Sequence, residues 1–314
     1  MTILVLGGAG FIGRHVVAAL LARRESVAIG TRNPRRALRR LPAAASCGLR
    51  EAHLERLTSP ASWYGLLEGI DVVVNAVGIL RERGAETYEG VHHLAPHALS
   101  EICARLGLRL IHVSALGLHD GARSGFLTSK LAGERAIAGS GADYTIVRPS
   151  LLDGDGGFGA RWLRWAAGWP VRLVPAGAAG RIAALDVSDL GNAIATLCVP
   201  HARGVWREVE LGGSESWTIA EYLAVLGTRG RSPAPIVEVP AWLARIGSYV
   251  CDLLHFSPFS SGHLELMRRD NVPRENLLPV LLGRAPTPVG LRLSRQAFAS
   301  TPTGQETPVP PSPQ

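Results

Sequence analysis

The chain has 314 residues, 46% of them apolar, and a formal net charge of +7. This length and apolar content predict one large domain, or one domain with a smaller lobe, around a substantial core. The basic balance suits an anionic ligand or surface. No recognition motif accompanies the charge, so nucleic acid is not an expected partner. The four cysteines form no CxxC pair and predict reduced thiols in a cytoplasmic protein.

Short apolar runs alternate with helical patterns over the first 150 residues, which is typical of a parallel α/β sheet. Strands are expected at 3–6, 26–30, 49–54, 71–75, 109–114 and 144–148, and helices at 12–23, 88–106 and 128–138. The run at 71–75 shows no alternation, so we expect it to be buried on both faces. The predicted fold class is α/β, a doubly wound parallel sheet of the Rossmann type with a small C-terminal α/β lobe.

The rhythm changes after residue 150. A glycine- and aspartate-rich loop is expected at 153–159, helices at 186–198, 218–226 and 241–256, and a strand at 205–211. From residue 300 the chain is rich in Pro, Thr, Ser and Gln, which predicts a disordered tail. The predicted division is a dinucleotide-binding domain at 1–150, a substrate or partner lobe at 151–299 that is interleaved with the last strands of the sheet, and a tail at 300–314.

A glycine motif follows the first expected strand and opens the first expected helix. Gly7, Gly10 and Gly13 have the spacing G-x-x-G-x-x-G, with Phe11 and Ile12 before the last glycine. Gly7 permits a tight turn, Gly10 lets the backbone approach a pyrophosphate, and Gly13 lets the helix pack closely on the strand. The phosphates would then lie at the helix N-terminus, where free N–H groups and the helix dipole favour an anion. The motif therefore predicts a dinucleotide site.

The end of the second expected strand distinguishes the two nicotinamide cofactors. An acidic residue there binds the ribose of NAD, whereas an arginine accommodates the 2′-phosphate of NADP. This chain has Thr31 and Arg32 at that place and no acid, so NADP(H) is predicted in preference to NAD(H). Small residues end the fourth strand and would let the adenosine lie against the backbone. They are Asn75, Ala76, Val77 and Gly78.

The chain contains a single lysine, Lys130. The 33 Lys+Arg residues include 32 arginines, and 32 + 1 = 33. A compact ammonium fits between two sugar hydroxyls, whereas a guanidinium is a broader planar fork. The residue four positions earlier is Phe126, which has no proton to give. This pair of residues raises the question of whether the protein is an enzyme or a cofactor-binding relative of enzymes.

Together with Ser114 and Arg148-Pro149-Ser150, these motifs resemble the short-chain dehydrogenase/reductase superfamily, in its extended and atypical, epimerase/dehydratase-like branches. The segment at 186–190 resembles a motif of the substrate lobe in extended members. Segments 126–134, 144–152 and 264–272 are similar to one atypical subgroup, which includes the dehydrogenase-like accessory subunit of respiratory complex I and its bacterial relatives. The resemblance covers about residues 1–290.

In active members of that superfamily, a serine, a tyrosine and a lysine cooperate. The resemblance implies that Ser114 hydrogen-bonds a substrate oxygen, that Lys130 holds the ribose, and that Pro149 lies against the cofactor. The tyrosine that transfers the proton, with a pKa lowered by the lysine, has its counterpart in Phe126. A phenyl ring transfers no proton, so the usual acid/base is absent.

Three interpretations remain open. The protein holds NADPH in a structural or redox-sensing role linked to respiratory quinone metabolism, as the resemblance to the complex I subunit implies. Alternatively, another group replaces the tyrosine, with His119 in the loop after Ser114 as the candidate. In the third, the acceptor is a quinone whose oxygens take protons from water. An active enzyme would use a quinone, an isoprenoid or a sugar nucleotide.

The tryptophans and arginines at 161–172 suit a lid over a substrate pocket, a lobe core, or contact with an anionic membrane. The amphipathic segment at 242–256 indicates lobe core or a partner interface. His93 and His97 have i, i+4 spacing, but no third ligand completes a set, so no metal is predicted. A strand beginning at Thr2 leaves no room for a leader, and no apolar run suits a transmembrane helix. The expected location is the cytoplasm, with peripheral contact with the inner face of the cell membrane or a respiratory complex as an open alternative.

Overall fold

The computed structural model describes residues 1–154, 156–227, 234–254 and 260–289. The expected tail at 300–314 and the end of the expected helix at 241–256 lie outside the described residues. A seven-stranded sheet forms the centre, in the order β11-β6-β5-β4-β1-β2-β3, and every pair of neighbours is parallel. The strands are β1 (Thr2–Leu6), β2 (Ser26–Thr31), β3 (Gly48–Glu51), β4 (Val72–Asn75), β5 (Arg109–Val113), β6 (Asp143–Pro149) and β11 (Glu208–Leu211).

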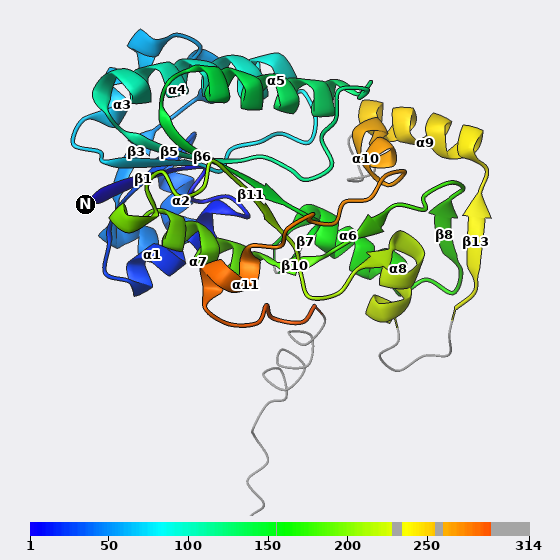
Figure 1. The fold of residues 1–314 in the computed structure, drawn as a ribbon. Helices are drawn as coiled ribbons and strands as arrows, with labels where there is room; N and C mark the ends of the chain where they lie inside the picture. The colour runs from blue at the N-terminus through cyan, green and yellow to red at the C-terminus, as the bar shows by residue number, and fades with distance from the viewer. Residues whose placement is uncertain (155, 228–233, 255–259, 290–314) are drawn as a thin grey trace, which may run out of the picture.

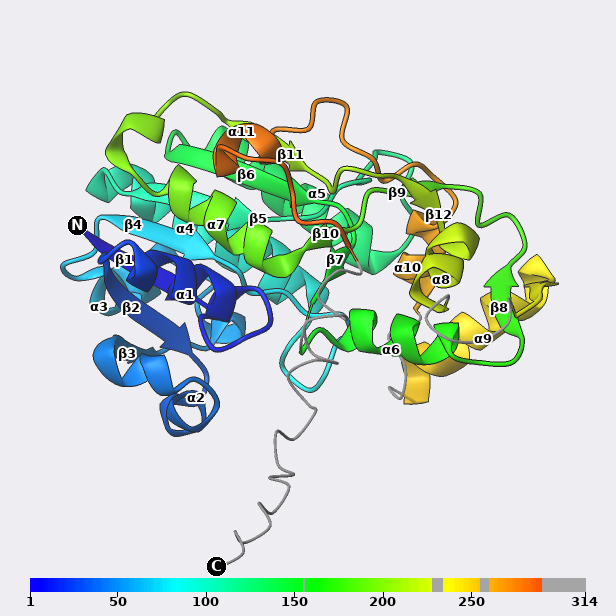
Figure 2. The ribbon, with the colours of Figure 1, turned by 90° about the horizontal axis from the view of Figure 1, so that it is seen from below.

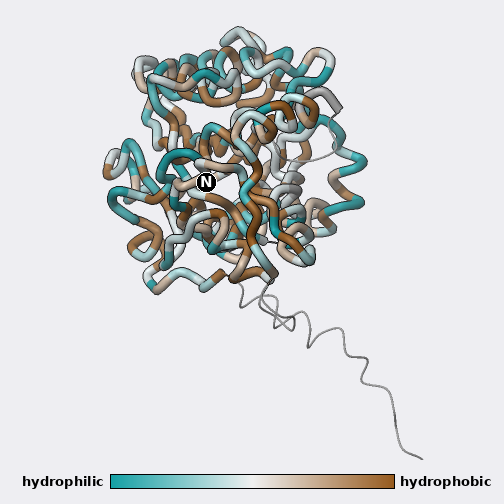
Figure 3. Tube along the Cα trace, turned by 90° about the vertical axis from the view of Figure 1, so that its right-hand side faces the viewer, coloured by the Kyte–Doolittle hydropathy of each residue, from teal (hydrophilic) through white to brown (hydrophobic). Residues whose placement is uncertain are grey.

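Helices cover both faces of this sheet (Figures 1 and 2). One face carries α1 (Gly13–Ala22), α7 (Val187–Leu197) and α11 (Leu278–Leu282), and the other carries α3 (Tyr64–Leu67), α4 (Ala95–Leu106) and α5 (Gly125–Gly139). Each face has its own cluster of buried apolar side chains. Coloured by hydropathy, the trace shows hydrophobic segments mainly in the interior (Figure 3). The predicted Rossmann-type α/β fold is confirmed.

Short elements connect the strands. The helix α2 (Pro34–Arg40) follows β2 at the edge of the sheet, and a π-helix (Glu89–Leu94) runs directly into α4. Short 3-10 turns lie at Pro42–Ser46, Leu54–Arg56, Pro60–Trp63 and Pro200–Ala202. Because strand order reverses between β1 and β4, the carboxyl ends of these two strands border the crevice where such sheets bind ligands.

The lobe is built from residues after β6. Its helices are α6 (Phe158–Ala167), α8 (Ile219–Gly227), α9 (Ala241–Leu254) and α10 (Ser261–Leu266). Its strands form three pairs: β7 (Leu152–Asp153) with β10 (Leu185–Asp186), β9 (Arg181–Ile182) with β12 (Trp217–Thr218), and β8 (Arg172–Pro175) with β13 (Ile236–Val239). Leu163, Tyr222 and Leu223 contribute to a small core of its own.

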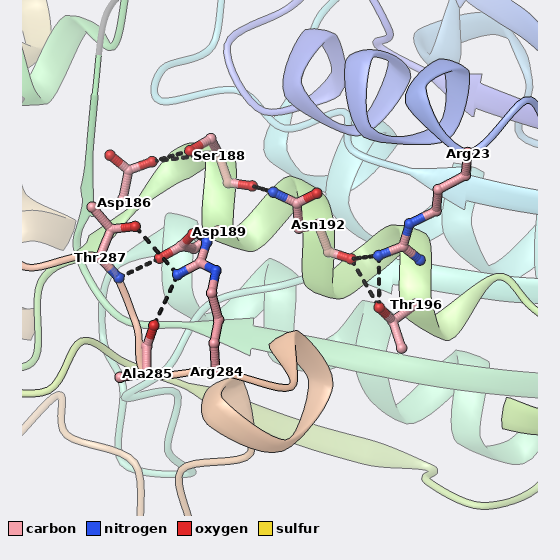
Figure 4. Close-up of polar contacts among 9 residues, drawn as sticks. All are labelled: Arg23, Asp186, Ser188, Asp189, Asn192, Thr196, Arg284, Ala285 and Thr287. Atoms are coloured by element: carbon pink, nitrogen blue, oxygen red, sulfur yellow. Dashed lines mark hydrogen bonds and ion pairs between the residues drawn. The ribbon is translucent and has the colours of Figure 1, made fainter.

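The segment at 186–190 resembles a substrate-lobe motif in sequence. In the structure it caps α7 and holds a later part of the chain against this helix (Figure 4). Asp186 caps α7, and its carboxylate accepts a hydrogen bond from the N–H of Ser188 at 2.7 Å. The buried carboxylate of Asp189 pairs with Arg284 and accepts a hydrogen bond from the N–H of Thr287 at 2.6 Å. The motif therefore ties the described end of the chain to the helix that supports the sheet.

The same helix, α7, is held against α1 of the nucleotide-binding half. Arg23, at the end of α1, donates hydrogen bonds to the carbonyl of Asn192 at 3.0 Å and the hydroxyl of Thr196 at 2.9 Å (Figure 4). A Cβ added at Gly191 would lie 2.6 Å from the carbonyl oxygen of His15, so the two helices pack at backbone distance. Because β11 also joins the sheet beside β6, residues on both sides of 150 build the central layer.

The strands and helices expected from sequence are present, with boundaries that differ by a few residues. The pattern did not predict α2, α3, α10, α11 or the strand pairs of the lobe, since two to seven residues carry too little periodicity. The proposed division at residue 150 stays a prediction. Among the described residues, no helix is both long and apolar enough to cross a membrane.

Candidate functional site

The glycine motif forms a tight turn between β1 and α1. Gly7 has φ +73°, which L side chains rarely adopt, and its N–H donates to the carbonyl of Gly30 at 2.8 Å. A Cβ on Gly13 would clash with the carbonyl oxygen of Gly7, so the helix start touches the turn. The first turn of α1 has no acidic residue and no capping side chain. The N–H groups of Arg14 and His15 donate to the carbonyls of Gly10 and Ile12. Those of Phe11, Ile12 and Gly13 have no acceptor among the described residues, so they can meet an anion, and the motif fits a pyrophosphate.

Arg14, directly after the motif, is a basic residue that the sequence analysis passed over. Its guanidinium carbon lies 5.9 Å from the ring centroid of Phe11. The loop after β7 covers both side chains, because a Cβ on Gly157 would lie 2.7 Å from the Phe11 ring and one on Gly156 would clash with Arg14. A cation beside the start of α1 adds to the attraction for phosphates. The sequence signal was its position immediately after Gly13.

Arg32 lies at the end of β2, as predicted, but it is not isolated. Its guanidinium forms an ion pair with Glu86 and is 60% exposed. The hydroxyl of Thr31 accepts a weak hydrogen bond from the N–H of Asn33 at 3.4 Å. A 2′-phosphate at this place would have to compete with the Glu86 carboxylate for Arg32, which weakens the preference for NADP(H) that an unpaired arginine would give.

The four residues that end β4 form a second turn at the crevice. Asn75 is fully buried, its amide oxygen accepts from the N–H of Val77 at 3.2 Å, and its amide nitrogen donates to Nδ1 of His112 at 3.2 Å. The N–H of Ala76 donates to Leu6 at 3.1 Å. The buried amide thus shapes this turn, and the predicted contact with adenosine would use its backbone. The turn consists of the predicted residues Asn75, Ala76, Val77 and Gly78.

Lys130 reaches the same turn from α5. A Cβ on Gly78 would lie 3.8 Å from Nζ of Lys130, and Nζ lies 5.7 Å from the ring centroid of Phe126. The side chain is 9% exposed, and its ammonium makes no hydrogen bond to the described residues. Burial lowers the pKa of Lys130 to about 8, against the opposite effect of the Glu134 carboxylate. A buried ammonium without an acceptor is suited to binding ribose hydroxyls.

Two buried histidines near Lys130 are neutral. His92 accepts a hydrogen bond from the N–H of Ile79 at 3.0 Å through Nε2, so Nδ1 carries the proton and donates to Ser129 at 3.1 Å. Burial, followed by the positive charge of Lys130, lowers the pKa of His92 to about 2 and that of His112 to about 3. The lysine is therefore the cation among these three groups.

Ser114 directly follows β5, and its backbone N–H donates to Val147 at 2.8 Å. Its hydroxyl oxygen is buried and has no hydrogen-bond partner among the described residues. Leaving a buried hydroxyl without a hydrogen-bond partner costs free energy. The Ser114 hydroxyl, at the carboxyl end of β5, is therefore suited to bind a ligand oxygen. Pro149 ends β6, and its carbonyl accepts from the N–H of Leu116 at 3.0 Å. The contact of Pro149 with the cofactor stays a prediction.

Phe126, at the place of the family's tyrosine, lies in a cluster of rings. Tyr88 and His92 meet it edge-on, with centroids 6.0 Å and 5.6 Å away. His263, from the lobe helix α10, stacks on Phe126 at 5.8 Å and 24°. Its Nδ1 lies 2.6 Å from the hydroxyl of Ser260, the N-cap of α10. His263 is 137 positions from Phe126, so the sequence carried no signal that the two meet.

His119, predicted as a substitute acid/base, lies elsewhere. It lines a hollow of about 460 Å³ together with Thr128, Leu131 and Arg135 of α5. Lys130 lies on the buried side of α5. Neither ring nitrogen of His119 has a hydrogen-bond partner among the described residues. The structure therefore brings Ser114, Lys130 and the turns into one crevice region without showing His119 beside them. Its proposed role stays a prediction.

Glu265 joins the lobe to the start of α5, beside His119. Its carboxylate accepts hydrogen bonds from the N–H groups of Arg123 and Ser124, both at 2.9 Å, and lies 3.9 Å from Nε2 of His119. Burial alone would raise the pKa of Glu265, but the two backbone hydrogen bonds lower it below its ordinary value. This carboxylate fixes α10, and hence His263, over α5.

These features define a nucleotide-binding α/β protein with a preserved lysine and a replaced tyrosine. A model of the family described as NAD(P)H-binding matches residues 7–163, half of the chain. The chain belongs to this NAD(P)H-binding family. It is 30% identical over 199 residues to the ceramide reductase of Caulobacter vibrioides, a match covering 62% of this chain and 60% of that protein.

A second relative bears on the predicted subgroup. The chain is 24% identical over 225 residues to mitochondrial NADH dehydrogenase [ubiquinone] 1 alpha subcomplex subunit 9 of Dictyostelium discoideum, covering 71% of this chain and 62% of that one. The predicted relation to the complex I accessory subunit is confirmed by this match. The alignments thus span about 60% of the length of these curated relatives.

Solved structures share the fold over nearly the whole chain. A nucleoside-diphosphate-sugar epimerase from Staphylococcus aureus has a TM-score of 0.73 at 19% identity, covering 92% of this chain and 98% of that one. An NADPH-dependent quinone oxidoreductase from Escherichia coli has a TM-score of 0.68, also at 19% identity, covering 94% and 99%. At this identity the likeness shows the fold alone. The predictions of a dinucleotide cofactor and an epimerase/dehydratase-like fold are confirmed.

Proposed function

We propose that this protein binds NADP(H) in preference to NAD(H) and holds it for a structural or redox-sensing role linked to respiratory quinone metabolism. One observation carries the proposal: Lys130 is retained without a protein acceptor, while Phe126 stands where a proton-transferring phenol is expected. The relation to a complex I subunit supports the respiratory link. We include peripheral contact with the inner face of the cell membrane, or with a respiratory complex, in this proposal.

Each part of the crevice has a role in binding. The N–H groups at the start of α1, with Arg14 beside them, would hold the pyrophosphate, and the turn ending at Gly78 would lie against the adenosine. Lys130 would donate hydrogen bonds to the nicotinamide ribose. Arg32 would exchange Glu86 for the 2′-phosphate, a stronger anion than a carboxylate. When bound, the cofactor supplies a hydride at its nicotinamide ring.

The test is to purify the protein, identify any retained nucleotide, and titrate NADPH and NADH. We expect NADPH to bind about tenfold more tightly or better, a difference of about 1.4 kcal/mol. Arg32→Ala should remove the preference, because it removes the cation that meets the 2′-phosphate. Arg105→Ala, an exposed arginine near the end of α4, is the matched control and should change neither affinity. Tighter binding of NADH would contradict the assignment.

A second candidate function is a reductase for a quinone, an isoprenoid or other lipid carbonyl, or a sugar nucleotide. The buried Ser114 hydroxyl without a partner favours it, because that hydroxyl is suited to an incoming oxygen. The name of one relative, a ceramide reductase, supports an apolar substrate. A carbonyl carbon would accept hydride, and its oxygen would take a proton. His263, which stacks on Phe126 from the lobe, would give this proton to a ketone, whereas a quinone would take it from water.

NADPH oxidation with a panel of quinones and apolar ketones separates the two functions. Stable NADPH binding without turnover supports the binding role, and rapid oxidation supports the reductase. In an active enzyme, His263→Gln should lower kcat for ketones about a hundredfold without changing the NADPH dissociation constant. His119→Gln is the matched control: an equal loss there would make His119 the proton donor instead. Phe126→Tyr in the His263→Gln background should restore part of the rate.

A further inference from the structure

The helix α9 presents its large apolar side chains to the outside. Five of them are 44% to 65% exposed and share one side of the helix; we name them the α9 face. They are Trp242, Leu243, Ile246, Tyr249 and Val250. The residues that point inward are small, with Ala244 at 4% and Ser248 at 0% exposure. This is the reverse of an ordinary surface helix, whose apolar stripe faces the core. Large exposed apolar patches mark interaction sites.

Other large apolar side chains are exposed elsewhere in the lobe. The strand β13 leads into α9 through Pro240, and its Ile236 and Val237 are exposed, as is Leu173 on the paired strand β8. On α6, Trp165 is 59% exposed, whereas Trp162 packs against the lobe core. The Trp/Arg segment at 161–172 is thus partly core, and the larger apolar surface lies on α9.

Exposed arginines on α9 and α2 favour an anionic partner. Arg245 is an exposed cation on α9, adjacent to the α9 face. Figure 2 shows α2 and α9 toward opposite ends of the molecule, with α6 between them. The sequence of α2 contains no acid, and its arginines are exposed without an ion pair to the described residues: Arg35, Arg36, Arg39 and Arg40. Exposed arginines attract anionic headgroups.

The side chains of the α9 face are also of the kind found at lipid interfaces. Trp242 and Tyr249 combine an apolar ring with one polar atom, which suits the boundary between headgroups and acyl chains. The α9 face holds no charged residue, so nothing on it resists contact with acyl chains. A helix with such a face lies in the plane of the interface and does not cross the bilayer, in agreement with the absence of a membrane-spanning helix among the described residues.

We infer that the α9 face, with the exposed Arg245 beside it, docks this protein on an anionic lipid bilayer. The inference rests on the peripheral membrane contact within the proposed function and names the surface that makes it. Docking by this side would bring the lobe, and with it the crevice beside Phe126, to the membrane where apolar quinones or lipid carbonyls reside. Nucleotide binding does not depend on it.

The experiment is flotation of the full chain with vesicles of phosphatidylglycerol and phosphatidylcholine, and with phosphatidylcholine alone. We expect binding to the anionic vesicles that weakens with salt. Ile246→Glu should reduce the partition coefficient at least about tenfold, because it places a carboxylate in the apolar face. Trp242→Ser, a second variant, should reduce it by a smaller factor. Val280→Glu on α11, where Val280 is 64% exposed, is the matched control and should bind as the unchanged protein does.

Two further measurements on the same samples decide between occupants. NADPH titration shows that each variant is folded, and it tests the proposed function separately from the docking. Light scattering gives the oligomeric state. A protein that ignores vesicles, or an Ile246→Glu variant that floats as well as Val280→Glu, overturns the inference. A dimer that Ile246→Glu splits, without vesicle binding, also overturns it and assigns the α9 face to a second copy.

Discussion

The β1–α1 turn and the helix α9 both use small residues, with opposite results. Gly13 lets α1 approach the turn so closely that a single added carbon would clash, and the large side chains of α1, such as Val16 and Leu20, are fully buried. In α9, Ala244 and Ser248 face inward, and the large side chains remain outside. Small residues thus allow close packing in the first region, whereas in α9 they occupy the buried side and the large apolar residues remain exposed.

The difference separates what the chain specifies by itself from what a partner must complete. The turn before Gly13 is held by backbone hydrogen bonds within the chain, from the N–H of Gly7 to Gly30 and from the N–H of Gly10 to Gly7, so its conformation is set by folding. The α9 face has no such partner among the described residues, and its exposed apolar area is unfavourable in water. Substitutions in the first region should therefore affect stability and nucleotide binding together, and those in α9 should affect neither.

The largest effect is expected from Gly13→Ala. The new methyl group would clash with the carbonyl oxygen of Gly7, which forces the turn and α1 apart. We expect a loss of about 2–4 kcal/mol in the free energy of unfolding and a loss of NADPH affinity of about a hundredfold or more. Urea denaturation and NADPH titration measure the two quantities.

Gly139→Ala is the matched control for that substitution. Gly139 ends α5, and a Cβ built there meets no atom within 4 Å. Because alanine has the better helix propensity, we expect the free energy of unfolding to rise by a few tenths of a kcal/mol, up to about 0.5. If Gly13→Ala were as harmless as Gly139→Ala, close packing would not be what the motif provides.

A smaller effect is expected at the tie between α7 and the end of the described chain. Asp189→Ala leaves the N–H of Thr287 without its acceptor and Arg284 without its ion pair. We expect the free energy of unfolding to fall by about 2 kcal/mol, with the NADPH dissociation constant changed by less than about threefold.

The exposed ion pair of Asp120 with Arg135 offers the control for the buried one. Asp120→Ala should change the free energy of unfolding by no more than about 0.5 kcal/mol, because solvent screens an exposed pair. Equal losses for the two variants would mean that burial of the Asp189 carboxylate adds nothing to this contact.

The sequence predicted the features whose signals are local. The glycine motif, the apolar run of β4 and the isolated lysine were all identified from contiguous residues, and the fold confirmed the sheet they imply. The ring contact between Phe126 and His263, and the ion pair between Arg32 and Glu86, could not be predicted. Both contacts join residues far apart in the sequence, through loops and through the lobe. No periodic pattern in the sequence indicates how the lobe packs against the sheet.

The orientation of α9 was out of reach for a related reason. An amphipathic pattern gives the direction of the apolar side but not whether protein or another phase covers it. The amphipathic pattern at 242–256 indicated lobe core or a partner interface. The exposure of Trp242 and Ile246 rules out core for these two positions. Tertiary packing decides which side of an amphipathic helix is buried, and in α9 it leaves the large apolar residues exposed.

A pH dependence is expected that belongs to the nucleotide-binding half alone. Burial lowers the pKa of Lys130 from its ordinary 10.5 to about 8, so the ammonium begins to lose its proton near that pH. If only the ammonium donates to ribose, NADPH affinity is constant well below pH 8 and falls above it, by up to about tenfold per pH unit. NADPH titrations across this range measure the fall.

The stability of the free protein should change in the opposite direction. Between pH 8 and 10.5 the unfolded chain keeps a proton on Lys130 that the folded chain has lost, so the free energy of unfolding rises with pH through this window. Lys130→Met should abolish both trends, because it fills the same space without a charge. Vesicle binding of Lys130→Met should match that of the unchanged protein, since the α9 face does not include the lysine. A common loss of both functions would instead mean that the nucleotide site and the α9 face are coupled.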